Sequence, residues 1–439
     1  MGKRKRFDRS IQQTTVESLS HDGRGISQNE GKKTFILGAL PGETVSYQPL
    51  KRAKGITSAV VTEIHEPSPK RIEPTCPHFT ACGGCQLQHL SQAEQVAHKH
   101  FVLQEQCKHI GQMEAESWAE PLVGPSYGYR RRARLSVKHV PKKGKVLVGF
   151  RELDGRFVSD NSTCPVLTPP FDELLTPLSD LIGQLSQPDK IPQIELTQAE
   201  PQPTLLIRHL AELNENDCSL LTDFAEQYSV CVLLQPKGYD SITDLAGERS
   251  EAELSYQLDG LTYFFRPEQF IQVNAVINER MMEQAIQWLN PQPTERILDL
   301  FCGIGNISLP LAKRAKWVTG VEGELSSVKQ AAKNAKHNNL SNTAFFAENL
   351  FDDCSKALWA MEHYDALVID PPRAGAKEIV ENISAFNPTR ILYISCHSAT
   401  LARDAGILQS HGYTLKKAGM MDMFPQTQHM EAMALFVKE

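Results

Sequence analysis

From about residue 275 onward, apolar runs of strand length alternate with segments in which apolar residues recur at helical spacing. Alternation of this kind is typical of a doubly wound parallel sheet with right-handed crossovers. The pattern predicts helices at 276–289, 307–315, 324–337, 376–384 and 398–410. The predicted strands are 296–301, 317–322, 343–348, 365–370 and 390–395, followed by two near 414–421 and 432–437.

The first part of the chain has a different pattern, in which short β-rich runs alternate with turns. The runs lie at 34–37, 43–47 and 58–64, and the turns at Asp22–Gly25 and Pro41–Gly42. Such a pattern predicts a small β-barrel.

The middle of the chain is less regular. Residues 92–114 have a helical pattern, and 129–163 return to a strand pattern with a turn at Lys143 and Gly144. Residues 165–262 mix helix and strand and carry no motif that we can interpret.

A length of 439 residues fits roughly two to four domains. Pro67 and Pro69 end the first β-rich part, and Pro74 and Pro77 lead into the first cysteines. We therefore predict a multidomain α/β protein in three parts. The parts are a β-barrel at 1–69, a central mixed α+β domain with a cysteine cluster at 70–262, and a doubly wound domain at 263–439.

The net charge of −6 is unevenly distributed, because residues 1–150 carry +10 and the remaining residues −16. A basic first part suits binding to a polyanion such as nucleic acid, although an ordinary solvated surface has the same composition. No apolar run approaches the roughly 20 residues that cross a bilayer, and the basic opening Lys3–Arg6 has no apolar segment behind it. We therefore expect a cytoplasmic protein that is neither secreted nor inserted in a membrane.

The segment Asp299–Asn306, which we name the cofactor loop, follows a predicted strand and precedes a helix. Gly303 and Gly305 allow backbone to approach a ligand closely, and Glu322 at the next strand end can accept hydrogen bonds from ribose hydroxyls. Ser308 stands where a dinucleotide site usually has a third glycine, which disfavours NAD and favours a cofactor without phosphates. A simple tight turn is the alternative interpretation.

Two further turns end apolar strands on the same predicted edge. The prolines of Asp370–Arg373 make that turn rigid, so the Asp370 carboxylate can be aimed. Cys396 precedes a helix that starts near Ser398, and a helix N-terminus can lower the pKa of a thiol. Alone, Cys396 would be read as a small buried apolar residue. With the two loops it predicts group transfer through a thiolate nucleophile, with His429 or Glu431 as general base.

Three of the ten cysteines lie close together, as Cys76, Cys82 and Cys85, and Cys164 follows far downstream. Four thiolates suit either zinc or a 4Fe-4S cluster, and the spacing does not decide between them. We interpret the centre as structural or as orienting RNA.

The segment Tyr127–Arg134 combines four arginines with two tyrosines. Guanidinium groups bind phosphates and aromatic rings stack on bases, so we expect RNA contact here. In a strand the arginines would lie on both faces, so we expect about half of them to form salt bridges instead.

These segments together resemble the iron-sulfur-containing RNA uracil-C5 methyltransferases over nearly the whole chain. The resemblance implies a TRAM domain, which is OB-like, for the barrel, and a Rossmann-like class I methyltransferase fold for the doubly wound domain. It implies Cys396 as nucleophile and Glu431 as proton acceptor. The implied cluster ligands of a 4Fe-4S centre are Cys76, Cys82, Cys85 and Cys164. The implied contacts to S-adenosylmethionine come from Gln272, Phe301, Asn306, Glu322, Asn349 and Asp370.

The resemblance also implies 23S ribosomal RNA as the partner and a monomeric protein. Alternatives are a transfer RNA substrate, an amino-group methyltransferase, and a metal-stabilised RNA-binding protein with a degenerate transferase fold. Arg373, where an amino-group enzyme has an aromatic residue, and Cys396 speak against the second alternative. A redox role for the cluster is also open.

Overall fold

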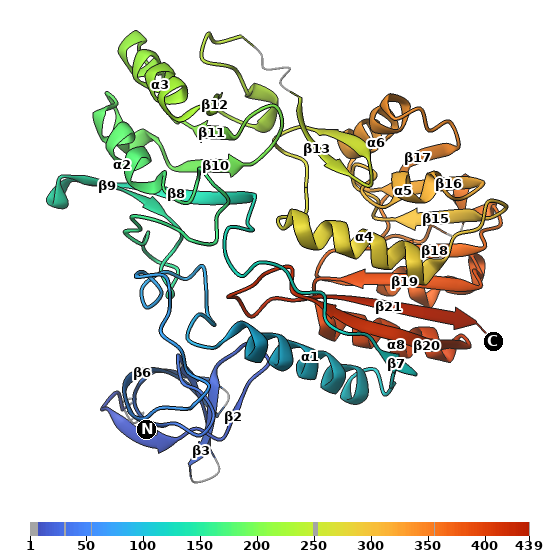
Figure 1. Cartoon of the computed structure of the whole chain (residues 1–439), viewed down its shortest axis with the longest axis horizontal. Helices are drawn as coiled ribbons and strands as arrows, with labels where there is room; N and C mark the ends of the chain where they lie inside the picture. Colours follow the sequence, from blue (N-terminus) through green and yellow to red (C-terminus); the bar gives the residue numbers. More distant parts are fainter. Residues whose placement is uncertain (1–7, 30–31, 54, 249–252, 355, 439) are drawn as a thin grey trace, which may run out of the picture.

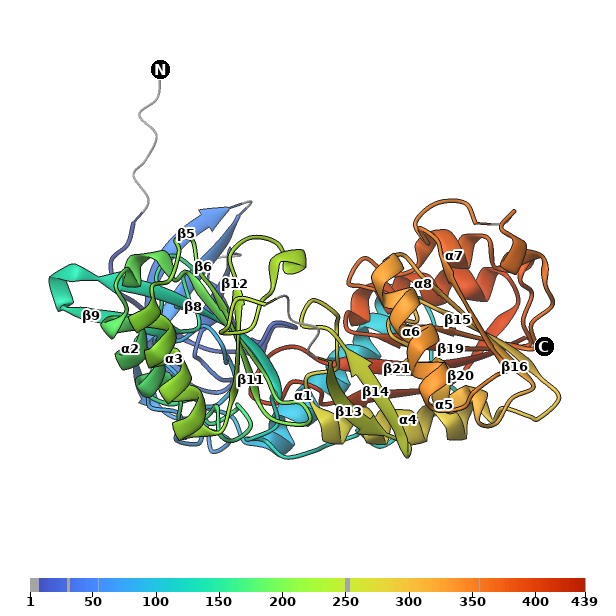
Figure 2. The ribbon, with the colours of Figure 1, turned by 90° about the horizontal axis from the view of Figure 1, so that it is seen from above.

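The computed structural model describes residues 8–29, 32–53, 55–248, 253–354 and 356–438 (Figure 1). The basic opening at Lys3–Arg6 lies outside these residues. Seen from above, the N-terminal and central parts form one side of the molecule and the C-terminal sheet forms the other (Figure 2). Among the described residues, no helix is long and apolar enough to cross a membrane.

The C-terminal sheet has eight strands in the order β17-β16-β15-β18-β19-β21-β20-β7. The five parallel strands are β15 (Arg296–Leu300), β16 (Trp317–Glu322), β17 (Thr343–Ala347), β18 (Ala366–Ile369) and β19 (Arg390–Ser395). The antiparallel pair is β20 (Tyr413–Met421) and β21 (Glu431–Lys438), with β21 between β19 and β20. The helices are α4 (Ala275–Leu289), α5 (Ser308–Ala312), α6 (Leu325–His337), α7 (Lys377–Glu381) and α8 (Ser398–Ser410). Every helix and strand predicted beyond residue 275 is confirmed.

Alternation along the strands sends neighbouring residues to opposite faces of this sheet, and both faces are covered. Leu367 and Ile391 pack in the core cluster beneath α7 and α8. Val368 and Leu392 pack in the other cluster, against α4 and α5 (Figure 2). Burial on both faces explains why these strands read as unbroken apolar runs.

Two elements from earlier in the chain complete the C-terminal sheet. Helix α1 (Gln92–His109) packs against α8 and contributes Val102, Leu103 and Cys107 to the same core cluster. Strand β7 (Ser117–Trp118) pairs with β20 in parallel. Both fall within the predicted central part at 70–262 but lie on the C-terminal sheet, so the three-part division by sequence remains a prediction.

The N-terminal sheet has the strand order β1-β5-β6-β4-β3-β2. Its strands are β1 (Gln12–Thr15), β2 (Ser18–Leu19), β3 (Gly25–Asn29), β4 (Lys32–Leu37), β5 (Thr44–Ala53) and β6 (Ile56–Glu66). The two edge strands β1 and β2 are separated only by Val16 and Glu17, so the sheet must curl until its edges meet. Val16 lies in the buried core of this sheet with Ile36 and Val45.

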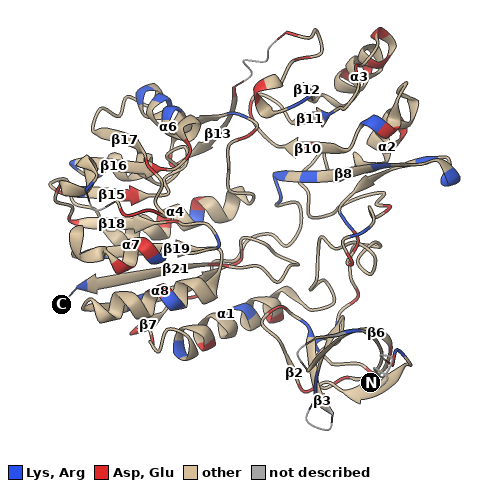
Figure 3. Ribbon diagram, turned by 180° about the vertical axis from the view of Figure 1, so that it is seen from behind, with Lys and Arg blue, Asp and Glu red and all other residues tan. Residues whose placement is uncertain are grey.

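The central sheet has the order β12-β11-β10-β8-β9. Its elements are β8 (Arg132–Val140), β9 (Lys145–Gly149), β10 (Gln193–Thr197), β11 (Thr204–Arg208), β12 (Cys231–Gln235), α2 (Leu175–Gln184) and α3 (Glu215–Tyr228). The predicted turn between β8 and β9 is confirmed, with Gly144 at φ 59°. Lys and Arg gather along β8 and this turn, and Asp and Glu on α3 (Figure 3). The hairpin of β13 (Leu254–Leu258) and β14 (Leu261–Phe265) packs instead in the core of the C-terminal sheet.

A buried ion pair joins α1 to the segment after β20. Lys99 Nζ lies 2.6 Å from Asp422 Oδ1, and the two side chains are 2% and 0% exposed. Lys99→Met would leave the Asp422 carboxylate buried without its partner, so we expect the free energy of unfolding in urea to fall by about 3–5 kcal/mol. Lys108→Met is the control: Lys108 is on the same helix with a 58% exposed side chain, and its loss should cost about 1 kcal/mol or less. An equal effect of the two substitutions would contradict the importance of the buried pair.

Candidate active site at the carboxyl edge of the C-terminal sheet

The predicted cofactor and catalytic residues follow the carboxyl ends of parallel strands, which lie along one edge of the sheet. The cofactor loop follows β15, Asn349 follows β17, Asp370 follows β18 and Cys396 follows β19, while Glu322 is the last residue of β16. This edge is where open parallel sheets bind ligands. The structure therefore brings six of the eight predicted cofactor and catalytic residues to one side of the domain, because the loop carries both Phe301 and Asn306.

The cofactor loop leaves space for a ligand next to its backbone. Gly303 has φ 55°, and apart from its own chain neighbours no heavy atom of the described residues lies within 4 Å of the place that a Cβ would occupy. Gly303 N donates a hydrogen bond of 3.1 Å to Glu322 Oε2, so the Glu322 carboxylate is held beside the loop. Gly305 has a different role, because a Cβ there would lie 3.2 Å from Leu309 of the following helix.

Asn306 is held by residues of β13 and α4, and Gln272 by Arg131, which directly precedes β8. Tyr256 Oη donates to Asn306 Oδ1 at 2.8 Å, and Asn306 Nδ2 donates to Asn278 Oδ1 at 3.0 Å. Arg131 Nε donates to the Gln272 carbonyl at 2.7 Å, and its guanidinium carbon lies 4.5 Å from the centre of the Tyr256 ring. A connected set of contacts therefore runs from the central sheet to two predicted cofactor residues.

Two more of the six predicted cofactor residues are Phe301, directly after β15, and Asn349, after β17. Phe301 has φ 63°, and its ring lies 5.8 Å from that of Phe351. Asn349 Nδ2 donates to Asp352 Oδ2 at 2.8 Å. Their location is consistent with the prediction, and their role in binding stays a prediction.

Two carboxyl groups with raised pKa values lie at this edge: Asp299, which is fully buried, and Asp370, which is partly buried. Burial raises the pKa of Asp370 to about 7. Burial also raises the pKa of Asp299 to about 7. The hydrogen bond from Ser308 opposes this shift, and the negative charges of Asp370 and Glu322 add to it. Among the described residues Asp299 Oδ1 has no hydrogen-bond partner. Asp299 opens the predicted cofactor loop, but our sequence interpretation gave it no role of its own, although an acidic residue inside an apolar strand was an available signal.

The strand register places Glu431 beside Cys396. Ser395 of β19 pairs with Ala432 of β21 in antiparallel fashion, so Cys396, which follows Ser395, comes opposite Glu431, which precedes Ala432. Cys396 is half-buried and Glu431 is buried. Of the two predicted general bases, this register favours Glu431.

The prediction that the start of α8 lowers the pKa of Cys396 is wrong. Burial, followed by the charges of Glu431 and Asp370, raises the pKa of this thiol to about 11, and Arg373 opposes the shift. Burial also raises the pKa of Glu431 well above its usual value, with a further contribution from Asp370. Two acidic neighbours and low solvent access outweigh the helix N-terminus.

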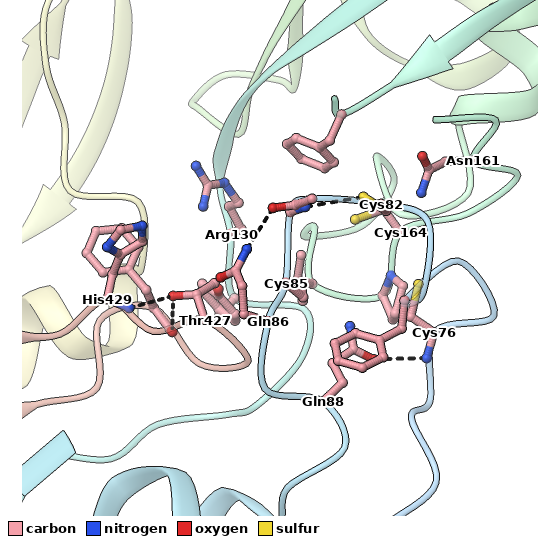
Figure 4. Close-up of a pocket in the computed structure, with 18 of the residues that line it drawn as sticks. Cys76, Cys82, Cys85, Gln86, Gln88, Arg130, Asn161, Cys164, Thr427 and His429 are labelled. Atoms are coloured by element: carbon pink, nitrogen blue, oxygen red, sulfur yellow. Dashed lines mark hydrogen bonds between the residues drawn. The ribbon is translucent and has the colours of Figure 1, made fainter. Parts of the chain in front are cut away.

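The four predicted cluster ligands line one cavity of about 270 Å³, which we name the cysteine cavity. Figure 4 shows Cys76, Cys82, Cys85 and Cys164 around one part of it, with Thr427 and His429 in the other part. Burial raises the pKa of Cys85 to about 11 and that of Cys164 to about 12. Within the described parts of the chain, no group of three or more His, Cys, Asp or Glu residues is arranged to hold a metal ion. The structure thus brings the four thiols to a common cavity without showing a formed metal site.

Gly83, which directly follows Cys82, is required by packing. A Cβ on Gly83 would lie 2.9 Å from the carbonyl oxygen of Arg151 and 3.0 Å from that of Glu152. This close approach brings the loop that carries Cys82 and Cys85 against the strand-like segment at residues 151–152.

Most of the arginines predicted to contact RNA instead connect parts of the protein. Arg134 Nη2 lies 2.9 Å from Glu195 Oε1 and Arg132 Nη2 lies 3.7 Å from Glu195 Oε2. Arg132 also donates to the carbonyl oxygens of Gln269 and Pro267. The prediction that about half of the four arginines form salt bridges is confirmed, and RNA contact by this segment stays a prediction.

Comparison with known proteins decides the family. The family model described as tRNA (Uracil-5-)-methyltransferase matches residues 205–439. A protein of Alkalilimnicola ehrlichii named 23S rRNA (uracil(1939)-C(5))-methyltransferase RlmD is 45% identical, and the alignment covers 100% of this chain and 99% of that protein. The chain belongs to the RNA uracil-5 methyltransferase family. The family predicted from the sequence is confirmed.

Other members of the uracil-5 methyltransferase family are similar in sequence to this chain along nearly their full length. Proteins with the same name from Hahella chejuensis and Xanthomonas campestris pv. campestris are 44% and 43% identical, each with 99% of both chains covered. The crystal structure of Pyrococcus abyssi tRNA (uracil-54, C5)-methyltransferase with S-adenosyl-L-homocysteine has a TM-score of 0.74 and covers 97% of this chain and 100% of that one. At 22% identity this likeness shows a shared fold. The predicted multidomain α/β architecture with a methyltransferase sheet is confirmed.

Proposed function

We propose that this protein transfers a methyl group from S-adenosylmethionine to carbon 5 of a uridine in 23S ribosomal RNA. The observation that supports this reaction best is the position of Cys396 opposite Glu431, at the sheet edge that also carries the cofactor loop. Full-length relatives at 43–45% identity are named as enzymes of this kind.

Cys396 would act as the covalent nucleophile. Carbon 5 of uracil is a poor nucleophile, so the Cys396 thiolate adds to carbon 6, and the electron pair of the C5–C6 double bond moves toward the carbon 4 carbonyl. When bound, S-adenosylmethionine supplies an electrophilic methyl group on its sulfonium. Carbon 5 would take that methyl group as the bond from the methyl carbon to sulfur breaks and S-adenosylhomocysteine is left, while Asp370 and Gln272 position the reactants.

Glu431 would complete the reaction. Its carboxylate removes the proton from carbon 5, the C5–C6 double bond re-forms and the bond between carbon 6 and Cys396 breaks. A buried carboxylate with a raised pKa is a stronger base than an exposed one, which suits this step. Since both target carbons lie within a stacked base, the nucleotide would have to be flipped into the site.

The raised pKa values predict how the rate depends on pH. Cys396 reacts as the thiolate and Glu431 as the carboxylate, and the pKa of each is raised, so both active forms increase as pH rises. We expect kcat/KM to increase between pH 7 and 9 by about tenfold per unit through the Cys396 thiolate, and more steeply wherever Glu431 titrates as well, since this ratio reports groups of the free enzyme. A rate that is flat or falls over this range would contradict the titration of these two groups.

The cofactor would be held by Gln272, Phe301, Asn306, Glu322, Asn349 and Asp370. The open space beside Gly303 and the Glu322 carboxylate at the end of β16 support this assignment. Acidic side chains at this place accept hydrogen bonds from ribose hydroxyls.

Cys76, Cys82, Cys85 and Cys164 would hold a 4Fe-4S cluster. Four buried thiols around one cavity form a suitable donor set. Iron and acid-labile sulfide measured on anaerobically purified protein test the assignment. Zinc without iron would refute it.

The curled N-terminal sheet would serve as a TRAM-type, OB-like RNA-binding domain, in a monomer that acts in the cytoplasm, where ribosomal RNA is modified. The closure of the sheet through Val16 and Glu17 supports a barrel. Removal of residues 1–69 should weaken RNA binding while leaving S-adenosylmethionine binding intact.

The reaction and its substrate are tested by mapping 5-methyluridine in ribosomal RNA from cells with and without this protein. Loss of one 5-methyluridine from 23S RNA, restored by the wild-type gene, is the expected result. A lost modification in transfer RNA instead would support the alternative substrate. Failure to bind S-adenosylmethionine by calorimetry would support a degenerate RNA-binding protein.

A further inference from the structure

The segment between β20 and Glu431, residues 422–430, is held at four successive carbonyl groups; we name it the C-terminal loop. The Met423 carbonyl accepts from Asn274 Nδ2 at 3.4 Å, and that of Phe424 from Lys99 Nζ at 3.1 Å. The Pro425 carbonyl accepts from Tyr129 Oη at 2.9 Å. Because consecutive carbonyl groups are each held by a hydrogen bond, the C-terminal loop follows a fixed backbone path toward Glu431.

The fourth carbonyl joins the C-terminal loop to residues 76–90, which carry three of the cysteines and which we name the cysteine loop. The Gln426 carbonyl accepts from the backbone N–H groups of Gln86 and Leu87, both at 3.0 Å. Gln86 directly follows Cys85. A displacement of the cysteine loop would therefore be transmitted to the C-terminal loop by two backbone hydrogen bonds.

Gln95 of α1 connects the same two loops with a single fully buried side chain. Its Oε1 accepts from Gln426 N at 2.9 Å, and its Nε2 donates to Gln426 Oε1 at 2.9 Å. Nε2 also lies 3.0 Å from the Leu87 carbonyl and 2.8 Å from that of Leu90. The Gln95 amide thus joins the C-terminal loop, through both of its polar atoms, to the last residues of the cysteine loop, through Nε2.

Gln426 itself has an unfavourable backbone conformation. Its φ is 68°, in the left-handed region that non-glycine residues rarely adopt. A residue keeps such a conformation only when several contacts with its surroundings hold it there, and residues of this kind are frequent at functional sites. The hydrogen bonds from Gln86, Leu87 and Gln95 hold Gln426 in this conformation.

We propose that Gln95 is a positioning residue, which locks the C-terminal loop onto the cysteine loop so that Glu431 stays opposite Cys396. The order of the cysteine loop, and of a cluster bound to it, is then a condition for base action by Glu431. The proposal rests on the proposed function, because it gives Gln95 its effect through the proton-removal step.

Two variants test this role. Gln95→Met keeps the length of the side chain and removes its hydrogen bonds. Gln426→Gly removes the partner amide while glycine adopts a positive φ without strain. For both we expect faster hydrogen exchange at the amides of residues 424–429. The kcat should fall on the order of 100-fold, as for a misplaced catalytic group, with an unchanged KM for S-adenosylmethionine and accumulation of the RNA adduct on Cys396.

The matched control is Gln104→Met, the same replacement on the same helix about 13 Å further along its axis. The iron content of all variants is measured as well, and we expect it to equal that of the wild type. Wild-type exchange and kcat in both variants would overturn the proposal. So would an equal loss in Gln104→Met, or a loss of activity that follows a loss of iron. If the wild-type protein forms no RNA adduct, the proposed function fails, whereas the exchange comparison still shows whether Gln95 holds the C-terminal loop.

Discussion

Replacing Cys396 with alanine is expected to reduce methyl transfer by about 10⁴-fold or more, because loss of a covalent nucleophile removes the reaction path itself. Binding of S-adenosylmethionine should be retained, since Cys396 follows β19 while the cofactor loop follows β15. The measurements are transfer of a labelled methyl group to ribosomal RNA and calorimetric titration with the cofactor. Cys218→Ala, on the central helix α3 and likewise partly exposed, is the control and should keep wild-type activity.

Substantial turnover by Cys396→Ala would refute the covalent route. Loss of cofactor binding in the same variant would show that Cys396 supports the cofactor site. The loss of activity would then no longer be evidence that the thiol is a nucleophile. The comparison with Cys218→Ala separates both results from a general sensitivity to removal of a thiol.

Replacing Glu431 with glutamine is expected to allow methyl transfer and then to stop the reaction, because an amide has the shape of the carboxyl group but cannot take the proton from carbon 5. Release of product should slow by about 10²–10⁴-fold, the usual range for loss of a general base. The methylated RNA should remain bonded to Cys396. It would be seen as a slowly migrating band on a denaturing gel that contains label from both RNA and methyl group.

The double variant Cys396→Ala, Glu431→Gln is the control and should give no such band, since it has no thiol to form the adduct. Release of product by Glu431→Gln at the wild-type rate would remove Glu431 from the mechanism. His429 would then be the next candidate; its ring is half-buried, and burial and the neighbouring Arg373 lower its pKa.

The fold of the C-terminal part could be predicted because its signals are local. Strand β19 and helix α8 have the predicted bounds, since an apolar run buried on both faces is followed directly by a helical repeat. The cofactor loop could be recognised for the same reason: glycines, strand and helix lie within a short stretch of chain.

Other features depend on contacts between distant residues, which a single sequence does not reveal. Val102 and Leu103 are apolar positions of a predicted helix, but nothing local indicates that they pack against α8, some 300 residues later. Gln95 and Lys99 look like ordinary surface residues of that helix, yet both are buried because their partners belong to the C-terminal loop. The pKa of Cys396 was mispredicted for a similar reason, since Glu431 and Asp370 reach it only in the folded sheet.

The position of β21 between β19 and β20 has a consequence for refolding. Both neighbouring strands precede β21 in the chain, so β19 has no antiparallel partner until β21, alone or paired with β20, inserts beside it. An intermediate without that insertion could already bind cofactor next to β15 and β16, but Cys396 would stand there without Glu431. After dilution from denaturant, recovery of cofactor affinity should therefore precede recovery of turnover.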